Sequence, residues 1–368
     1  MTTTLSRTRM LASNESSWKS GTQDLETLRS SAFCVLACAT EEDADCLAGA
    51  ERNLAYYLLW TGKYNESIQR ANRAIQWFDQ VGDIRGQAES HDIVSMSQMF
   101  LGALGAAIES ALEALNLFQK IGCQRGCAWG YHNLGHIYEK LEEYENAEQY
   151  YLQSVSVFKE IAYDFGLSRA AAGLGELYKC LGNYEGALRF LSMSMKHTDQ
   201  ANSMAVWTKT SLLAGLVQLE MGKDEQAKKT LEDCLQNCGE EENLEVACRA
   251  SLALGELAAK QSLEEKALNY LFSALDAAER ACSDRFQAES HLRISSYFAQ
   301  KGRFQKALEH HQKYAQRAIK EKRIQESQLV ASLQSAEEQR VEANQMRKLA
   351  EQRRKEFEHA NFELQQQI

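Results

Sequence analysis

Four residues with metal-binding side chains lie close together in the sequence: Cys123, Cys127, His132 and His136. Thiolates and imidazoles are the usual ligands of structural zinc, which requires that they converge on a tetrahedron. Zinc fingers achieve this with a longer loop between the Cys pair and the His pair. Here Cys127 and both histidines are expected on one helix, where His132 lies about 140° around the axis from Cys127. We therefore predict that this cluster binds no metal.

The sequence gives no other indication of catalytic chemistry. It contains no Gly-rich phosphate loop, and no Ser/His/Asp or Cys/His set occurs in a recognisable structural context. The Asp and Glu residues are scattered in the way that is typical of solvated helix faces. We expect no catalytic residues in this chain and no cofactor.

The composition favours one continuous helical body. Of the 368 residues, 44% are hydrophobic and 25% are charged, which is sufficient for an extensive core. The chain has 21 Gly and no Pro, so helices can run over most of its length. The ten Cys fall mostly within apolar helical patterns, and we interpret them as small core residues in a reducing compartment.

Charge and hydropathy exclude several classes of partner. The net charge of −10 argues against nucleic acid or an anionic membrane surface as the main partner. No apolar run approaches the roughly 20 residues that span a bilayer, and the first residues lack the apolar region of a secretory signal. We predict a cytoplasmic protein with neither a nucleic-acid nor a membrane partner.

A 40-residue repeat organises most of the chain. Turns with the pattern Gly-x-aromatic begin at Gly62, Gly182 and Gly302, and their spacings are multiples of 40. The complete ladder of turn positions is Gly62, Gly102, Glu142, Gly182, Gly222, Ser262 and Gly302. Five residues after each of these comes a small residue: Ser67, Ala107, Ala147, Ala187, Ala227, Ala267 and Ala307. Copies that keep one spacing throughout predict seven tandem structural units.

A second ladder of small residues precedes the turns. Its members are Ala55, Ser95, Gly135, Gly175, Gly215, Gly255 and Ser295. We predict that each unit contains two antiparallel helices and that the small residues lie where these helices cross, because they allow the backbones to approach closely. A single unit cannot bury its apolar face alone, so stacking of the units must supply the core.

The segments NLGHIYEKLEEYENAEQYYLQSV (Asn133–Val155) and AGLGELYKCLGNYEGALRFL (Ala172–Leu191) resemble tetratricopeptide repeats. The resemblance extends over about residues 48–316 and implies an all-α, right-handed superhelical solenoid of about seven helix-turn-helix units. The sequence differs from the family in its period of 40 rather than about 34 residues and in lacking the Pro that is often found near the end of a repeat. The longer period predicts longer helices, similar to those of bacterial signalling regulators and of some eukaryotic scaffold proteins.

In this family the first helix of each unit lines the concave groove, so equivalent positions indicate the candidate binding surface. In the first four units these positions are Arg52, Tyr56, Trp60, Asp92, Met96, Met99, Phe100, Trp129, His132, His136, Glu139, Arg169, Glu176 and Lys179. Later units add Leu212, Leu216, Leu219, Leu252 and Glu256. Such a wall suits a peptide or protein ligand with apolar anchors, or is helix-packing core for some of its apolar members. The Lys and Asn clamp of the chaperone-binding members is not reproduced.

The two ends of the array differ from the repeats. We expect residues 1–22 to be flexible, residues 23–47 to form a capping helix, and residues 317–368 to form one long helix rich in Gln, Glu, Arg and Lys. The seam of this helix, spaced mainly by seven residues, contains Leu329, Ala336, Ala343, Met346, Ala350, Phe357 and Leu364. Heptad spacing favours a coiled-coil homodimer. A solvated helix and a helix folded back on the array are the alternatives.

Together these features favour a protein-protein interaction module. The predicted role is a sensory or scaffold region that binds a protein or peptide in its groove and dimerises or relays a signal through the last helix. The terminal EFEHANFELQQQI resembles the linker helices that precede diguanylate cyclase or histidine kinase domains, although no GGDEF-like motif occurs in the chain. The alternatives are the regulatory N-terminal portion of such an enzyme, with its catalytic domain beyond residue 368, and a small-molecule sensor.

Overall fold

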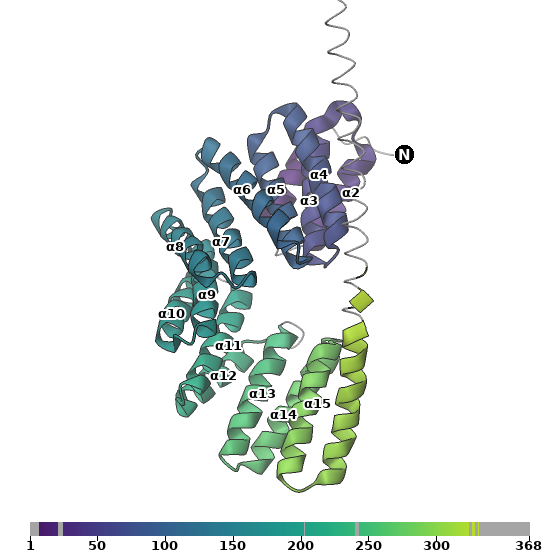
Figure 1. The fold of residues 1–368 in the computed structure, drawn as a ribbon. Helices are drawn as coiled ribbons and strands as arrows, with labels where there is room; N and C mark the ends of the chain where they lie inside the picture. Colours follow the sequence, from purple (N-terminus) through teal and green to yellow (C-terminus); the bar gives the residue numbers. More distant parts are fainter. Residues whose placement is uncertain are drawn as a thin grey trace, which may run out of the picture. The chain divides into compact units, whose positions relative to one another are not determined.

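The computed structural model of the chain describes residues 7–20, 25–201, 203–239 and 243–323, together with residues 326, 327 and 330. Regular secondary structure in these residues is helical throughout, and the helices stack side by side as a solenoid (Figure 1). The chain divides into two compact units, Met1–Arg317 and Ala318–Ile368, and the first contains the repeats. No described helix is both long enough and apolar enough to cross a membrane.

The repeat prediction is confirmed in both helices of each unit. The repeats are preceded by α1 (Arg7–Ser20), α2 (Leu25–Cys38) and the 3₁₀ turn η2 (Glu41–Asp43). The first helices of the units are α3 (Ala44–Trp60), α5 (Ile84–Phe100), α7 (Gln124–Lys140), α9 (Asp164–Cys180), α11 (Met204–Glu220), α13 (Leu244–Lys260) and α15 (Asp284–Gln300). The second helices are α4 (Tyr64–Val81), α6 (Leu104–Lys120), α8 (Tyr144–Glu160), α10 (Tyr184–Ala201), α12 (Asp224–Gln236), α14 (Glu264–Arg280) and a helix over residues 304–323.

Every predicted turn position adopts a left-handed backbone, whether or not it is Gly. Glu142 has a φ of 62° and Ser262 a φ of 59°. Such a residue closes the preceding helix because its N–H and that of the next residue donate to carbonyls of the last turn. A second ladder with positive φ lies halfway between the predicted turns and connects each unit to the next; its described members include Gly82, Gly122, Ala162 and Cys282. Few members of this ladder are Gly, so the sequence pattern does not indicate these turns.

The small residues of the first helices lie at the crossings within units, as predicted. A Cβ atom at Gly135 would lie 2.8 Å from the Tyr151 ring, and one at Gly175 would lie 2.6 Å from the Leu191 side chain. These distances are shorter than any normal carbon contact, so only Gly lets the bulky residue of the second helix fill the crossing. Where the first helix has Ser instead, as at Ser95, its hydroxyl donates to the Ala107 carbonyl at 2.8 Å.

A different set of close contacts joins consecutive units in the first half of the array. Phe78, Phe118 and Phe158 on the second helices each point at a Gly on the following first helix, and the Gly residues are Gly86, Gly126 and Gly166. A Cβ atom at Gly126 would lie only 2.3 Å from the Phe118 ring. The Phe side chain therefore fills the space between two units from the outer helix.

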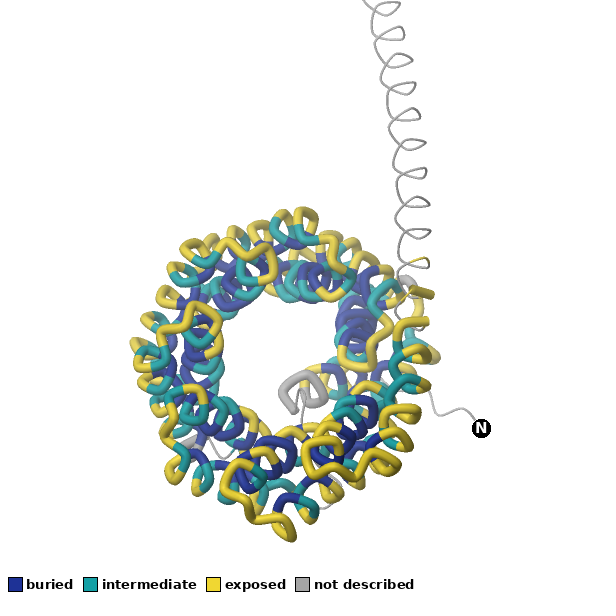
Figure 2. Tube along the Cα trace, turned by 60° about the horizontal axis from the view of Figure 1, so that its bottom comes forward, coloured by how far each residue is buried: buried dark blue, intermediate teal, exposed yellow. Residues whose placement is uncertain are grey.

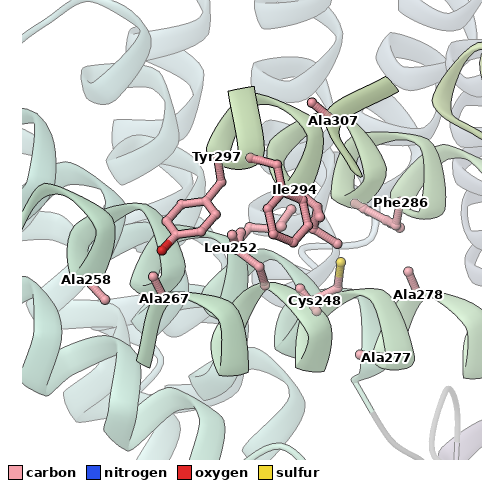
Figure 3. Close-up of a cluster of buried hydrophobic side chains, with 13 residues drawn as sticks. Cys248, Leu252, Ala258, Ala267, Ala277, Ala278, Phe286, Ile294, Tyr297 and Ala307 are labelled. Atoms are coloured by element: carbon pink, nitrogen blue, oxygen red, sulfur yellow. The ribbon is translucent and has the colours of Figure 1, made fainter. Parts of the chain in front are cut away.

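The later units fill the same space from the opposite side. At the equivalent positions Thr198 lies on α10, Cys238 follows the end of α12 and Ala278 lies on α14, and the first helices carry Val206, Val246 and Phe286. Phe286 and Ala278 lie in one cluster of buried side chains (Figure 3). In the later units the bulky residue therefore lies on the first helix instead of the second. As a result, bulky apolar side chains reach the inner wall described below.

The N-terminus differs from the flexible segment that we expected over residues 1–22. Residues 7–20 form α1, which packs against α2 and α3. Asn14 is 2% exposed, donates to the Cys46 carbonyl at 2.8 Å and accepts at its own carbonyl from Asn53 Nδ2 at 2.9 Å. These tertiary contacts stabilise a helix whose sequence alone has little amphipathic character. The predicted capping helix is present as α2, and the first unit starts at Ala44 rather than residue 48.

The structure describes only part of residues 317–368, for which we predicted one long helix. The 304–323 helix completes the seventh unit, and Arg317 pairs with Asp284 of α15 at 2.6 Å. The coiled-coil seam from Leu329 to Leu364 lies outside the described residues. All ten cysteines are free, but only Cys46, Cys234 and Cys248 are buried, so the expectation of core cysteines holds for a minority of them.

The Phe118–Gly126 contact predicts a measurable packing constraint. Gly126→Ala should destabilise the protein by about 1–3 kcal/mol, because the added methyl group overlaps the Phe118 ring. Gly105→Ala is the control: this helical Gly has nothing within 4 Å of its Cβ position, so Ala should be neutral or stabilise by about 0.4–1 kcal/mol. Urea denaturation of both variants measures the difference.

The exchange of large and small residues between units can be tested with a double variant. Phe118→Thr combined with Gly126→Val copies the pair Thr198 and Val206 found two units later. We expect the double variant to be more stable than the sum of its two single variants predicts, because one substitution fills the space that the other vacates. Additive losses of stability in urea would contradict this account of the contact.

Candidate binding groove

The first helices of the units form the inner wall of the stacked array. Figure 2 shows buried and half-buried residues along the inner side of the curve and exposed residues along the outer side. A hollow of about 240 Å³ opens on this wall, and every residue that lines it belongs to a first helix. Its lining is His132, His136, Arg169, Ala172, Gly173, Glu176, Val206, Lys209, Thr210, Leu212, Leu213, Glu245, Val246, Arg249 and Phe286.

Five residues of the predicted surface meet in this hollow: His132, His136, Arg169, Glu176 and Leu212. They come from α7, α9 and α11, and the 40-residue spacing makes His136 equivalent to Glu176. The structure therefore brings together the middle part of the predicted surface.

The two histidines are held in an aromatic environment. The His132 ring lies 5.5 Å from the Trp129 ring and 5.6 Å from the Tyr151 ring, measured between centroids, and His132 is 5% exposed. Among the described residues, Nδ1 of His132 and Nδ1 of His136 have no hydrogen-bond partner. Burial lowers the pKa of His132 well below its usual value and lowers the pKa of His136 to about 4, with the Arg169 charge contributing in both cases. Both rings are neutral at physiological pH.

Tyr151 links the outer helix α8 to the inner wall. Its ring passes between Gly135 and Gly173, where Cβ atoms would lie 2.8 Å and 2.7 Å from ring atoms. The hydroxyl donates to Oε2 of Glu139 at 2.8 Å. Burial raises the pKa of Glu139, and this hydrogen bond opposes the rise. Glu139 is therefore oriented by Tyr151.

Arg169 is a half-buried cation without an ion pair. No carboxylate of the described residues lies within salt-bridge distance of it, although Glu176 is close enough to influence its pKa. Burial is the largest influence and lowers the pKa of the guanidinium from its usual value. The hollow thus contains a positive charge that no salt bridge among the described residues neutralises.

Two predicted residues in the early units instead contact neighbouring helices. Arg52 Nη1 lies 2.6 Å from Glu89 Oε2, which joins α3 to α5. Asn133 Nδ2 donates to Asp92 Oδ1 at 2.6 Å, which joins α5 to α7. Burial raises the pKa of Asp92 to about 6. These side chains hold consecutive inner helices together.

The remaining predicted residues are dispersed over other surfaces. Tyr56 and Trp60 meet edge to face at 6.0 Å, Phe100 stacks on Tyr64 at 5.2 Å, and Trp129 packs on Phe158 at 5.1 Å. Met96 packs against the buried cluster around Ile93, and Lys179 is half-buried.

The inner face of the first unit is covered by α1. Asn14 lies against Gly49 and Asn53 of α3. By the 40-residue spacing, Gly49 is equivalent to Arg169 and Asn53 to Gly173, both of which line the hollow in the fourth unit. Part of the predicted groove is therefore occupied by the chain's own N-terminal helix.

Sequence reasoning missed several residues of the hollow that come from later units. Lys209 and Arg249 follow Trp129 and Arg169 at 40-residue spacing, so the repeat itself could have identified them. Val206, Val246 and Phe286 had no such signal, because the early units have Gly at this position. Their bulk, described above as filling the space between units, also forms the apolar floor of the hollow.

The Cys and His pairs of the candidate metal cluster are separated. Cys123 and Cys127 pack beside Phe118 and Ala88, whereas His132 and His136 face the hollow. Within the described ranges no group of three or more His, Cys, Asp or Glu residues is arranged to hold a metal ion.

Comparison with known proteins agrees with the repeat architecture. A family model described as tetratricopeptide repeat matches residues 125–199, which cover most of the third and fourth units. No curated protein matches the sequence.

Solved structures are similar over most of the chain. The apo form of RapI has a TM-score of 0.62 at 14% identity, over 86% of this chain and 86% of that chain. The apo form of the quorum sensor NprR from B. thuringiensis has a TM-score of 0.62 at 13% identity, over 85% and 87%. A Rap protein complexed with competence and sporulation factor has a TM-score of 0.59 at 12% identity, over 89% and 87%. At these identities the similarity establishes the fold.

The lowered pKa of His136 predicts a pH dependence of stability. Between about pH 4 and pH 6.5 the unfolded chain binds a proton at this residue that the folded chain does not, so stability decreases as the pH falls through this range. His136→Gln should therefore lose less stability than the parent over the same range. Urea denaturation at several pH values measures the two slopes.

The control is the comparison above about pH 7.5, where the imidazole is neutral in both states and the two slopes should coincide. Asp92 and the other shifted groups are present in both proteins, so the difference reports His136 together with its charge coupling to His132. Parallel slopes throughout would show that His136 is not held neutral.

Proposed function

We propose that the chain is a binding protein that takes a peptide, or an extended segment of a protein, in the inner groove formed by α7, α9, α11, α13 and α15. The observation that carries the proposal is the hollow on this wall. It combines an apolar floor, formed by Val206, Val246 and Phe286, with charged side chains around it. Ligand sites commonly combine apolar contact area for affinity with a few polar groups that fix orientation.

The position of α1 supports a groove that receives chain segments. On α3 this helix occupies the inner-face positions that are open on α9 and α11, and it uses both buried side chains and hydrogen bonds to backbone carbonyls. The wall of the array is therefore suited to holding a polypeptide segment. Of the similar solved structures, NprR is a quorum sensor and a Rap protein is in complex with competence and sporulation factor.

A steric block of the hollow tests the proposal. Ala172 lines the hollow and is half-buried, so Ala172→Trp should fill part of the space without changing any charge. Peptides selected from a random display library on the full chain should bind the variant at least about tenfold more weakly. Fluorescence anisotropy with the labelled peptides measures this change.

The matched control is Ala106→Trp, at an exposed Ala of the second helix α6. This variant should bind the selected peptides like the parent, and unchanged thermal melting of both variants establishes that they fold. If no peptide is selected, or if the two Trp variants bind equally well, the groove is not a peptide site.

We further propose that the C-terminal segment relays or organises binding as a coiled-coil homodimer. The support is the heptad spacing of Leu329, Phe357 and Leu364 and the separation of Ala318–Ile368 from the repeat unit. In this role the repeats are the input region of a cytoplasmic regulator or scaffold, and the last helix connects it to an output.

Charge substitutions in the seam test the dimer. Leu329→Glu combined with Leu364→Glu should convert a dimeric full-length chain into a monomer, because each substitution places two like charges in an apolar seam. Light scattering at micromolar concentration measures the mass. Glu358→Gln, outside the proposed seam, should leave the mass unchanged, and a monomeric parent protein would contradict the proposal.

A further inference from the structure

Three cations occupy one repeat position on consecutive inner helices. Arg169 lies on α9, Lys209 on α11 and Arg249 on α13, each 40 residues after the last, and all three line the hollow. Arg169 is half-buried, while Lys209 and Arg249 are exposed. The array therefore presents a row of positive charge along the groove of a chain whose net charge is −10.

None of these cations has an ion-pair partner among the described residues, although acidic groups are close. Glu176 and Glu245 line the same hollow, but neither forms a salt bridge with the row. Two other arginines of the first helices are paired: Arg52 with Glu89 at 2.6 Å and Arg293 with Glu256 at 2.9 Å. The row of Arg169, Lys209 and Arg249 is distinguished by its three unpaired cations at one repeat position on consecutive helices, all lining one hollow.

A second observation shows unused binding capacity at the same place. His132 is 5% exposed, lines the hollow, and has an Nδ1 atom with no partner among the described residues. Leaving a buried polar atom unsatisfied carries a free-energy cost. Partial burial also disfavours the charge of Arg169 and lowers its pKa. A ligand that supplies anionic oxygens would relieve the cost at Arg169.

We propose that the groove recognises an acidic peptide in an extended conformation, whose carboxylates pair with Arg169, Lys209 and Arg249 while intervening side chains contact Val206, Val246 and Phe286. This inference rests on the proposed peptide-binding function and specifies the chemistry of the ligand. The spacing of the row sets the spacing of the carboxylates. Consecutive inner helices contact each other directly, and packed helix axes lie about 8–10 Å apart.

An extended chain of the polyproline-II type advances about 3.1 Å per residue and turns once every three residues, so every third side chain faces the same way at about the spacing of neighbouring helices. The preferred ligand therefore carries Asp or Glu at about every third position. Glu176 and Glu245 disfavour a continuous anionic backbone such as nucleic acid, because its unbroken phosphate charge would also meet these carboxylates.

The ligand would supply links that the central helices do not have. Polar links join α3 to α5 through Arg52 and Glu89, and α13 to α15 through Arg293 and Glu256. Between α9 and α11, and between α11 and α13, no side-chain hydrogen bond or ion pair joins the described residues. Each ligand carboxylate placed between two cations of the row would bridge two consecutive units.

Display selection on the full chain tests the proposal. The probe is a random library of peptides of about ten residues, long enough to cross three units. We expect the selected peptides to be enriched in Asp and Glu at intervals of about three positions. Replacing these acids by Asn and Gln in synthetic copies should weaken binding by about tenfold or more, and added salt should weaken binding of the acidic copies.

Variants of the row provide the second measurement. Lys209→Gln and Arg249→Gln should each raise the Kd of the acidic peptides by about tenfold, and together should reduce the salt dependence, since Arg169 remains. Lys229→Gln is the matched control, because Lys229 is an exposed lysine of the second helix α12 that does not line the hollow. It should leave the Kd unchanged.

The outcomes separate this inference from the proposed function. Selected peptides that are apolar or basic, and that are blocked by Ala172→Trp but unaffected by the Gln variants, would retain the groove as a peptide site and overturn the acidic specificity. Failure to select any peptide would overturn both. Binding of a fluorescent single-stranded oligonucleotide that the selected peptides cannot displace, and that requires Lys209 and Arg249, would assign the row to nucleic acid and also overturn the proposal.

Discussion

The whole array depends on how closely two helices can approach when one of them carries no side chain at the contact. At the crossings of the third to sixth units a bulky residue occupies the space that a Gly leaves, as Tyr151 does at Gly135 and Leu191 at Gly175. Because protein interiors are close-packed, this pairing fixes the distance between helices. First helices of 17 residues each and turns with one backbone conformation then repeat that geometry along the chain. Curvature, and with it the inner wall, follows from the repetition.

The proposed binding surface coincides with a change within this repetition. In the first half, Phe118 and its equivalents fill the space between units from the outer helices and meet Gly on the inner ones. In the second half the inner helices supply Val206, Val246 and Phe286, which reach the groove as well as the core. Core packing and ligand surface are therefore formed by the same side chains in the later units, whereas in the first unit α1 covers the inner face.

Much of the fold could be predicted because the 40-residue ladder is marked by Gly and Ala, whose role at turns and crossings has few alternatives. The second turn ladder was missed because Ala162 and Cys282 adopt a left-handed backbone that their residue types do not indicate. The helix α1 was missed because it is stabilised by tertiary contacts of Met10 and Asn14. In the groove, His132 and Arg169 were identified from their repeat positions. Lys209 and Arg249 occupy equivalent positions, but the later units were interpreted mainly through their leucines.

The uneven distribution of polar links along the inner wall has a mechanical consequence. Arg52 with Glu89 and Arg293 with Glu256 act as cross-braces near the two ends of the array. The helices α9, α11 and α13 contact one another without such braces among their described residues. Under a bending or stretching load, we expect α9, α11 and α13 to shift relative to one another more easily than the helices near the two ends. These same three helices carry the row of Arg169, Lys209 and Arg249.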